Sequence, residues 1–208
     1  MITISEEIFI LMLDSETGRL TDRLPSETIS NTLSGALLME LAINNRIDTD
    51  LEGLFVTSNA SMREPLLDIV LEQIAADPKK RPTRYWVRVF ATGAERIADR
   101  LTESLVERGI LLRQRDRLLR FIGNYTITHE SGRSDRDVLH RIAGIVQTND
   151  IPAPRDIMII ALADACGLWE LVFGPDTFTT VEPRIKSFAG IELIGQAVVQ
   201  EIAKARTD

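Results

Sequence analysis

Two arginines, Arg96 and Arg100, lie one helical turn apart in the stretch AERIADRL. Guanidinium groups at positions i and i+4 of a helix can converge on one phosphate and donate bidentate hydrogen bonds to it. The alternative is that both arginines are solvated and pair with nearby carboxylates such as Glu103. The spacing therefore allows an anion site without requiring one.

A second group of candidate residues lies in KKRPTRYWVRVF, residues 79–90. Each Lys or Arg near an anionic membrane surface contributes about 1 kcal/mol of attraction, and Trp and Tyr favour the membrane interface. The alternative is that the aromatic residues face the core while the charges face water. The predicted membrane-facing residues are Lys79, Lys80, Arg81, Arg84 and Trp86.

The charge of the chain is unevenly distributed. The 208 residues carry a formal net charge of −7, which argues against binding nucleic acid or acidic lipid with the whole surface. Residues 79–120, however, hold 12 of the 24 Lys and Arg and only 5 of the 31 Asp and Glu, so this span alone nets +7. The asymmetry favours an anionic partner, although basic residues scattered over solvated helix faces would give the same count.

Catalytic and metal-binding patterns are missing from the sequence. Two histidines and one cysteine make a structural zinc site improbable, and no GxSxG, HExxH, GxGxxG or P-loop pattern occurs. We therefore expect no enzyme, no metal and no cofactor. Cys166 lies among apolar and small residues and is expected in the core. A lone cysteine and an N-terminus unlike a secretory signal predict a cytoplasmic protein.

The hydrophobic periodicity predicts a mainly α protein: a single compact helical domain over residues 1–208 with one or two small β-hairpins. Ser5 is the expected N-cap of the first helix, and Gly35 is expected to allow a close helix contact. The expected helices cover residues 4–13, 26–44, 64–77, 83–108 with a break at Gly93, 134–147, 153–173 and 182–205. The expected hairpins cover residues 46–58 and 110–122, the second with a Gln-Arg-Asp tip.

Four stretches in order, LSGALLMELA, EPLLDIVLEQI, RLTESLVERGIL and IMIIALADACGLWELVF, resemble the Golgi phosphoprotein 3 family over nearly the whole chain. The resemblance implies a helical, non-enzymatic domain that binds phosphatidylinositol 4-phosphate on membranes; eukaryotic members also bind coat protein and glycosyltransferase tails. The family's headgroup pocket falls at Pro25, Ser34, Glu95 and Ala98, so its chemistry is altered here. The chain starts directly on the domain, as expected of a short bacterial-type member.

The resulting prediction is a non-enzymatic peripheral membrane protein at the cytosolic face of a membrane. It is expected to bind anionic phospholipid headgroups, phosphatidylinositol 4-phosphate or a similar lipid, through Arg96, Arg100 and Arg23. The resemblance also links the 110–122 hairpin to self-association, so a homo-oligomer is expected. The predicted oligomerisation residues are Arg113, Arg115, Arg117 and Leu119.

Two other functions remain open. Residues 93–108 and 110–122 could form a recognition helix and wing that bind nucleic acid. The acidic residues in 93–108 and the net negative charge oppose this, so no nucleic-acid partner is expected. The chain could also be an oligomeric adaptor that binds no lipid.

Overall fold

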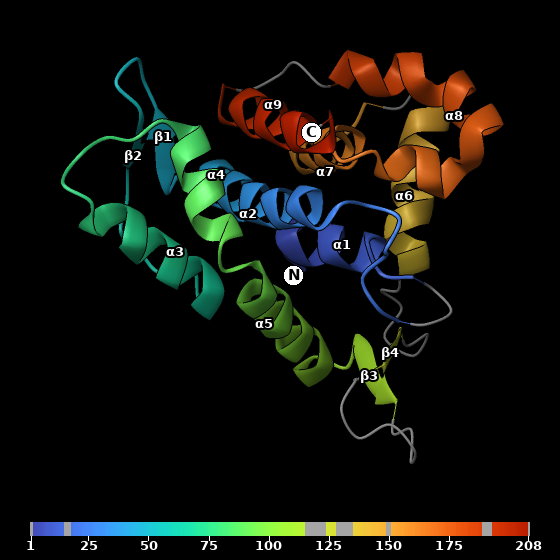
Figure 1. Cartoon of the computed structure of the whole chain (residues 1–208), viewed down its shortest axis with the longest axis horizontal. Helices are drawn as coiled ribbons and strands as arrows, with labels where there is room; N and C mark the ends of the chain where they lie inside the picture. Colours follow the sequence, from blue (N-terminus) through green and yellow to red (C-terminus); the bar gives the residue numbers. More distant parts are fainter. Residues whose placement is uncertain are drawn as a thin grey trace.

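A long apolar helix, α2 (Ser26–Ile43), runs through the middle of the molecule (Figure 1). Every residue from Thr28 to Leu41 except Ser30 is buried. A helix that is buried on all sides must be surrounded by other elements. Here α1 (Ile4–Leu11), α4 (Thr83–Ala91), α7 (Pro154–Ala165) and α9 (Leu193–Thr207) pack against it.

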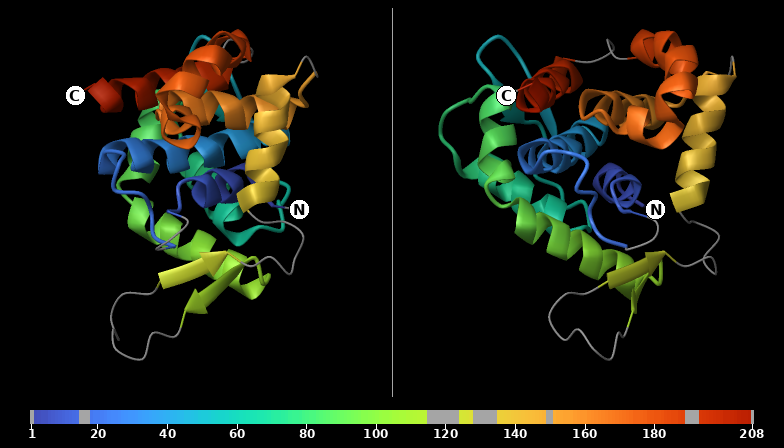
Figure 2. Two further views of the ribbon diagram at one scale, coloured as in Figure 1. Left: turned by 90° about the vertical axis from the view of Figure 1, so that its right-hand side faces the viewer. Right: turned by 45° about the vertical axis from the view of Figure 1, so that its right-hand side comes forward.

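The structure, a computed structural model, describes residues 2–14, 18–114, 124–127, 135–148, 151–188 and 193–207. The remaining helices in these ranges are α3 (Pro65–Ala76), α5 (Ala94–Glu107), α6 (Asp135–Gln147) and α8 (Leu168–Phe188). Strand β1 (Ile47–Thr49) pairs with β2 (Leu54–Val56), and β3 (Leu111–Gln114) pairs with β4 (Asn124–Ile127), both antiparallel. The β3–β4 hairpin projects beyond the end of α5, away from the helices (Figure 2). The predicted mainly α fold with small hairpins is confirmed.

Gly35 allows α2 and α9 to approach closely, as predicted. A Cβ atom added at Gly35 would lie 2.2 Å from Cγ1 of Val198 on α9, which is well inside van der Waals contact. The glycine therefore brings the C-terminal helix directly onto the central one, and this contact closes the core above α2 (Figure 1).

The break between α4 and α5 is also as predicted. Helix α4 ends at Ala91, and α5 begins after Gly93, whose backbone is not helical. The N–H of Gly93 donates to the carbonyl of Phe90, which closes the last turn of α4. The chain then changes direction, so that α4 and α5 form a corner facing α3 (Figure 1).

The predicted helices at 153–173 and 182–205 are wrong. Gly167 adopts a positive φ of 80°, a conformation that ends helices, and α7 and α8 are bent by 84° around it. Helix α8 is itself kinked at Gly174, continues to Phe188, and is followed by α9 from Leu193. Within the described ranges no single helix has the length and apolarity of a bilayer span; only the bent pair α7–α8 has them when taken together.

Two local predictions are also corrected. The N-cap of α1 is Thr3 and not Ser5: the Thr3 hydroxyl accepts from the N–H of Glu6, and the Glu6 carboxylate accepts from the N–H of Thr3. The second strand of the 110–122 hairpin lies later than predicted, because Leu111 pairs with Ile127. The β-favouring Tyr125 lies in that strand. Gln114, the first residue of the predicted Gln-Arg-Asp tip, lies in β3 opposite Asn124, and residues 115–123 lie outside the described ranges.

Candidate anion-binding groove

Arg96 and Arg100 line a groove of about 350 Å³ between α3 and the corner formed by α4 and α5. Buried residues of α5 recur every four positions at Ile97, Leu101 and Leu105. Each arginine directly precedes a buried residue, which places it at the edge of the buried stripe and not on the outer face. Helical periodicity thus directs both guanidinium groups along the side of α5 that faces α3.

The groove is electropositive because no acidic side chain lines it. Its polar side chains are Arg96, Arg100, Gln73 and Thr92, and the rest of its lining is apolar or glycine. Neither arginine forms an ion pair or hydrogen bond with a residue that the structure describes. The pairing with Glu103 that was considered as the alternative is not observed, although Arg100 and Glu103 both line a neighbouring hollow.

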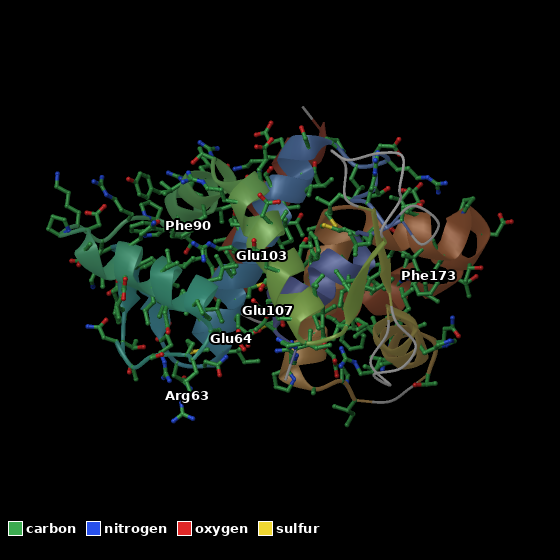
Figure 3. All side chains as sticks on the ribbon, turned by 90° about the horizontal axis from the view of Figure 1, so that it is seen from below. Arg63, Glu64, Phe90, Glu103, Glu107 and Phe173 are labelled. Atoms are coloured by element: carbon green, nitrogen blue, oxygen red, sulfur yellow. The ribbon has the colours of Figure 1, made fainter. Side chains whose placement is uncertain are left out.

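This neighbouring hollow, of about 370 Å³, continues along α5 and has the opposite character. Glu64, Glu103 and Glu107 line it, and Figure 3 shows all three on the side of the molecule where the start of α3 approaches α5. Arg100 borders both spaces. Burial and then the negative charge of Glu6 raise the pKa of Glu64, as expected where carboxylates are crowded.

The side-chain charge on this side of α5 therefore changes from positive to negative along the helix. Positions 96, 100, 103 and 107 follow a 4-3-4 spacing, which keeps them on one side of a helix. The first two are arginines and the last two are glutamates. A ligand in the groove would contact cations at the N-terminal half of α5 and would face carboxylates beyond Arg100.

The basic residues of the 79–108 span fall into two groups. Four of them are neutralised by carboxylates: Lys80 by Asp50 and Glu52, Arg81 by Asp77, Arg88 by Glu201, and Arg108 by Glu6. The others, Lys79, Arg84, Arg96 and Arg100, are exposed and form no ion pair with a described residue. The cationic surface is thus smaller than the sequence count suggested.

Lys80 illustrates the neutralised group. Its ammonium donates a hydrogen bond to Asp50, which raises the pKa of Lys80 and lowers that of Asp50. The ammonium also lies 4.7 Å from the ring centroid of Phe55. These contacts hold Lys80 on the β1–β2 hairpin, so less of its charge is available to a membrane.

The prediction that Trp86 faces a membrane is wrong. Trp86 is only 4% exposed, and its ring stacks on Phe90 with 5.7 Å between centroids. The 3.6-residue period of α4 turns Trp86, Val87 and Phe90 inward, and its neighbour Tyr85 is the exposed aromatic residue.

The other predicted site residues do not join the groove. Arg23 is exposed in the segment before α2 and does not line the groove. Arg113 lies in β3, paired with Tyr125. Arg115, Arg117 and Leu119 lie outside the described residues, so the role of the hairpin in oligomerisation stays a prediction.

Comparison with known families supports the resemblance noted in the sequence. The family model of Golgi phosphoprotein 3 (GPP34) matches residues 4–205, nearly the whole chain. The chain belongs to the Golgi phosphoprotein 3 family. A direct comparison with curated proteins gave no match. The family is known generally for phosphoinositide binding and is not an enzyme family.

The positions to which the resemblance assigns the family's headgroup pocket lie outside the groove. Ser34 is buried in α2, and its hydroxyl donates to the carbonyl of Ser30. Glu95 and Ala98 lie on the opposite edge of the buried stripe of α5 from the two arginines, because successive residues are separated by about 100°. None of these positions, nor Pro25, lines the α3–α5 groove. The groove is therefore distinct from the pocket that the resemblance implies.

Sequence reasoning missed a buried charge cluster between the helices; its Glu6 and Arg108 line the acidic hollow and not the α3–α5 groove. Glu6 of α1 binds Arg108 of α5, Glu7 binds Arg141 of α6, and Glu40 of α2 binds Arg155 of α7. Two acidic residues inside the apolar stretch ISEEIFILML were the available signal, since a fully buried helix must pair its charges. No described group of three or more His, Cys, Asp or Glu side chains is arranged to hold a metal ion. The ion pairs of the cluster join α1 to α5 and α6, and α2 to α7.

Proposed function

We propose that this chain is a peripheral membrane protein that binds anionic phospholipid headgroups through the α3–α5 groove, without catalysis. The observation that carries the proposal is the pair of arginines in a groove without carboxylates. In a chain of net charge −7, such a groove selects for a negative ligand. Membership of a family known for phosphoinositide binding supports the same class of ligand.

General attraction to a membrane accounts for only part of the binding. Four unpaired cations, Lys79, Arg84, Arg96 and Arg100, at about 1 kcal/mol each contribute roughly 4 kcal/mol, which corresponds to a millimolar dissociation constant. Tighter binding requires charge-assisted hydrogen bonds to one phosphate, which two guanidinium groups on the same side of a helix can donate. Long-range attraction brings the protein to the cytosolic face of the membrane, and the groove retains a headgroup there.

Co-sedimentation with vesicles tests this proposal. Phosphatidylcholine vesicles containing phosphatidylinositol 4-phosphate, phosphatidylinositol or phosphatidylserine are compared with pure phosphatidylcholine at low and physiological salt. Arg96→Gln and Arg100→Gln should each weaken binding by more than about 5-fold, and the double variant by more than about 30-fold, since loss of the general attraction alone accounts for these factors. The matched control is Lys204→Gln on α9, which removes the same charge away from the groove and should change binding little.

Salt and vesicle composition give the deciding outcomes. Real binding should weaken as salt rises, because exposed charges are screened beyond about 8 Å at physiological ionic strength. Failure to bind any anionic vesicle at low salt would refute the proposal. Binding that Arg96→Gln and Arg100→Gln leave unchanged would move the membrane contact away from the groove.

The nucleic-acid alternative gains no support from the described residues. The side of α5 that would enter a DNA groove carries Glu103 and Glu107 in its C-terminal half, where they would repel phosphates. A gel shift with random duplex DNA separates the two classes of ligand. The lipid proposal predicts no shift at physiological salt.

A further inference from the structure

Apart from Arg96, Arg100, Gln73 and Thr92, the side chains that line the α3–α5 groove are aliphatic or aromatic. Leu66, Ile69 and Val70 form the α3 side, and Val89 and Phe90 form the α4 side. Ile69 is 37% exposed and is one of the few large apolar side chains of the described residues left in water. Apolar surface beside a cationic site favours a guest that has an apolar part next to its anion.

The groove is poorly suited to a headgroup rich in hydroxyls. A polyol such as inositol donates O–H hydrogen bonds and needs acceptors, and hydroxyl groups placed against aliphatic walls lose their hydrogen bonds to water. Among its side chains the groove offers two acceptors, the Gln73 amide oxygen and the Thr92 hydroxyl oxygen, whose own proton goes to the carbonyl of Val89; these are fewer than the hydroxyls of one inositol ring. A phosphate, in contrast, needs donors only, and Arg96 and Arg100 supply them.

The acidic hollow limits the charge of the headgroup. Glu103 and Glu107 lie beyond Arg100 on the same side of α5. A headgroup that carried a second phosphate in this direction would approach these carboxylates and be repelled. The space between the arginines therefore favours one compact phosphate.

We infer that the α3–α5 groove is a site for a lipid phosphate monoester of the phosphatidate class. The phosphate lies between Arg96 and Arg100, and the glycerol backbone and first methylenes lie against Leu66, Ile69 and Val89. This inference rests on the proposed function and names the lipid that the same groove prefers. The groove selects the lipid headgroup. The positions matched to the family's headgroup pocket do not.

Titration calorimetry with soluble ligands tests the inference on the intact chain. The ligands are dihexanoyl phosphatidate below its micelle concentration, inorganic phosphate, and inositol 1,4-bisphosphate. Dihexanoyl phosphatidate should bind at least 10-fold more tightly than either of the other two. Equal binding of inositol 1,4-bisphosphate would overturn the preference, and equal binding of inorganic phosphate would overturn the apolar subsite.

Matched variants separate the phosphate contact from the apolar contact. Ile69→Ser should weaken dihexanoyl phosphatidate several-fold and leave inorganic phosphate unchanged, whereas Arg96→Gln should weaken both. Ile151→Ser is the control, because Ile151 is 95% exposed and does not line the groove. Leu66→Ser provides a second apolar variant if thermal melting shows that Ile69→Ser is unstable. Unchanged phosphatidate affinity in the folded apolar variants would overturn the inference.

Vesicles distinguish this inference from the proposed function. Vesicles containing phosphatidate, phosphatidylserine or phosphatidylinositol are matched for surface potential. Stronger binding to phosphatidate supports the inference. Equal binding to all three overturns the inference and leaves the proposed function standing, whereas no binding to any of them overturns the proposed function itself.

Discussion

Replacing Glu6 by glutamine tests how much the ion pair between buried Glu6 of α1 and Arg108 of α5 stabilises the protein. The Glu6 side chain is 2% exposed and accepts hydrogen bonds from the N–H of Thr3 at 2.8 Å, from the hydroxyl of Ser104 at 2.7 Å and from Nη1 of Arg108 at 2.9 Å. Glutamine fills the same volume but removes the charge and turns an acceptor oxygen into a donor that faces other donors.

The structure sets bounds on the free energy of unfolding that Glu6→Gln is expected to lose. Removing one partner of a buried ion pair costs about 3–5 kcal/mol, because the other charge is left without compensation. Arg108 is 31% exposed and can turn toward water, so the lower end, about 3 kcal/mol, applies. For a chain of this length such a loss lowers the melting temperature by roughly 6–12 °C.

Urea unfolding followed by circular dichroism measures this loss through the midpoint and slope of the transition. Glu72→Gln on the exposed face of α3 is the matched control and should stay within about 0.5 kcal/mol of the parent. A double-mutant cycle with Arg108→Gln should give a coupling of about 0.5–3 kcal/mol. A loss in Glu6→Gln no larger than in the control, or strictly additive effects of the two changes, would refute the reasoning.

The remaining predictions concern Gly35 and Glu64. Gly35→Ala should destabilise the protein by about 1–3 kcal/mol in urea unfolding, since the new methyl group collides with Val198. Gly144→Ala in α6 meets nothing within 4 Å and should stabilise by up to about 1 kcal/mol; similar losses in both variants would disprove the close contact. Burial and the charge of Glu6 raise the pKa of Glu64, so the folded state binds its proton more tightly and the free energy of unfolding falls as the pH rises above about 4.5. Glu64→Gln should remove this pH dependence. The variant should be more stable than the parent by less than about 1 kcal/mol at pH 7, because the side chain is part-exposed, and equally stable at pH 3. A stability gain that does not depend on pH would contradict the electrostatic cause.

Local sequence signals predicted the elements that depend on nearby residues. Pro65 opens α3, Gly93 separates α4 from α5, and the β1–β2 hairpin lies where the two short alternating stretches placed it. These features depend on backbone conformations and periodicities that are set within a few residues. For the same reason, the sequence could give the position of Arg96 and Arg100 on one side of a helix.

Predictions failed where distant segments decide the outcome. The pairing of Leu111 with Ile127 depends on a strand that follows a long connection, and apolar residues within 115–123 offered a nearer but incorrect partner. Gly167 interrupts an apolar run that reads as one helix; its positive φ ends α7, and hydrophobic periodicity does not report this backbone conformation.

The sequence by itself determined the helical class of the fold and the excess of positive charge in residues 79–120, because composition and periodicity are properties of the chain alone. Its ordered motifs resemble the Golgi phosphoprotein 3 family, and the family model matches residues 4–205. Only the tertiary structure decided which of those charges remain available. Lys80, Arg81, Arg88 and Arg108 meet carboxylates, three of them supplied by residues at least 28 positions away in sequence, whereas Arg96 and Arg100 face a groove that contains none. An ion pair depends on distance in space, and folding sets that distance.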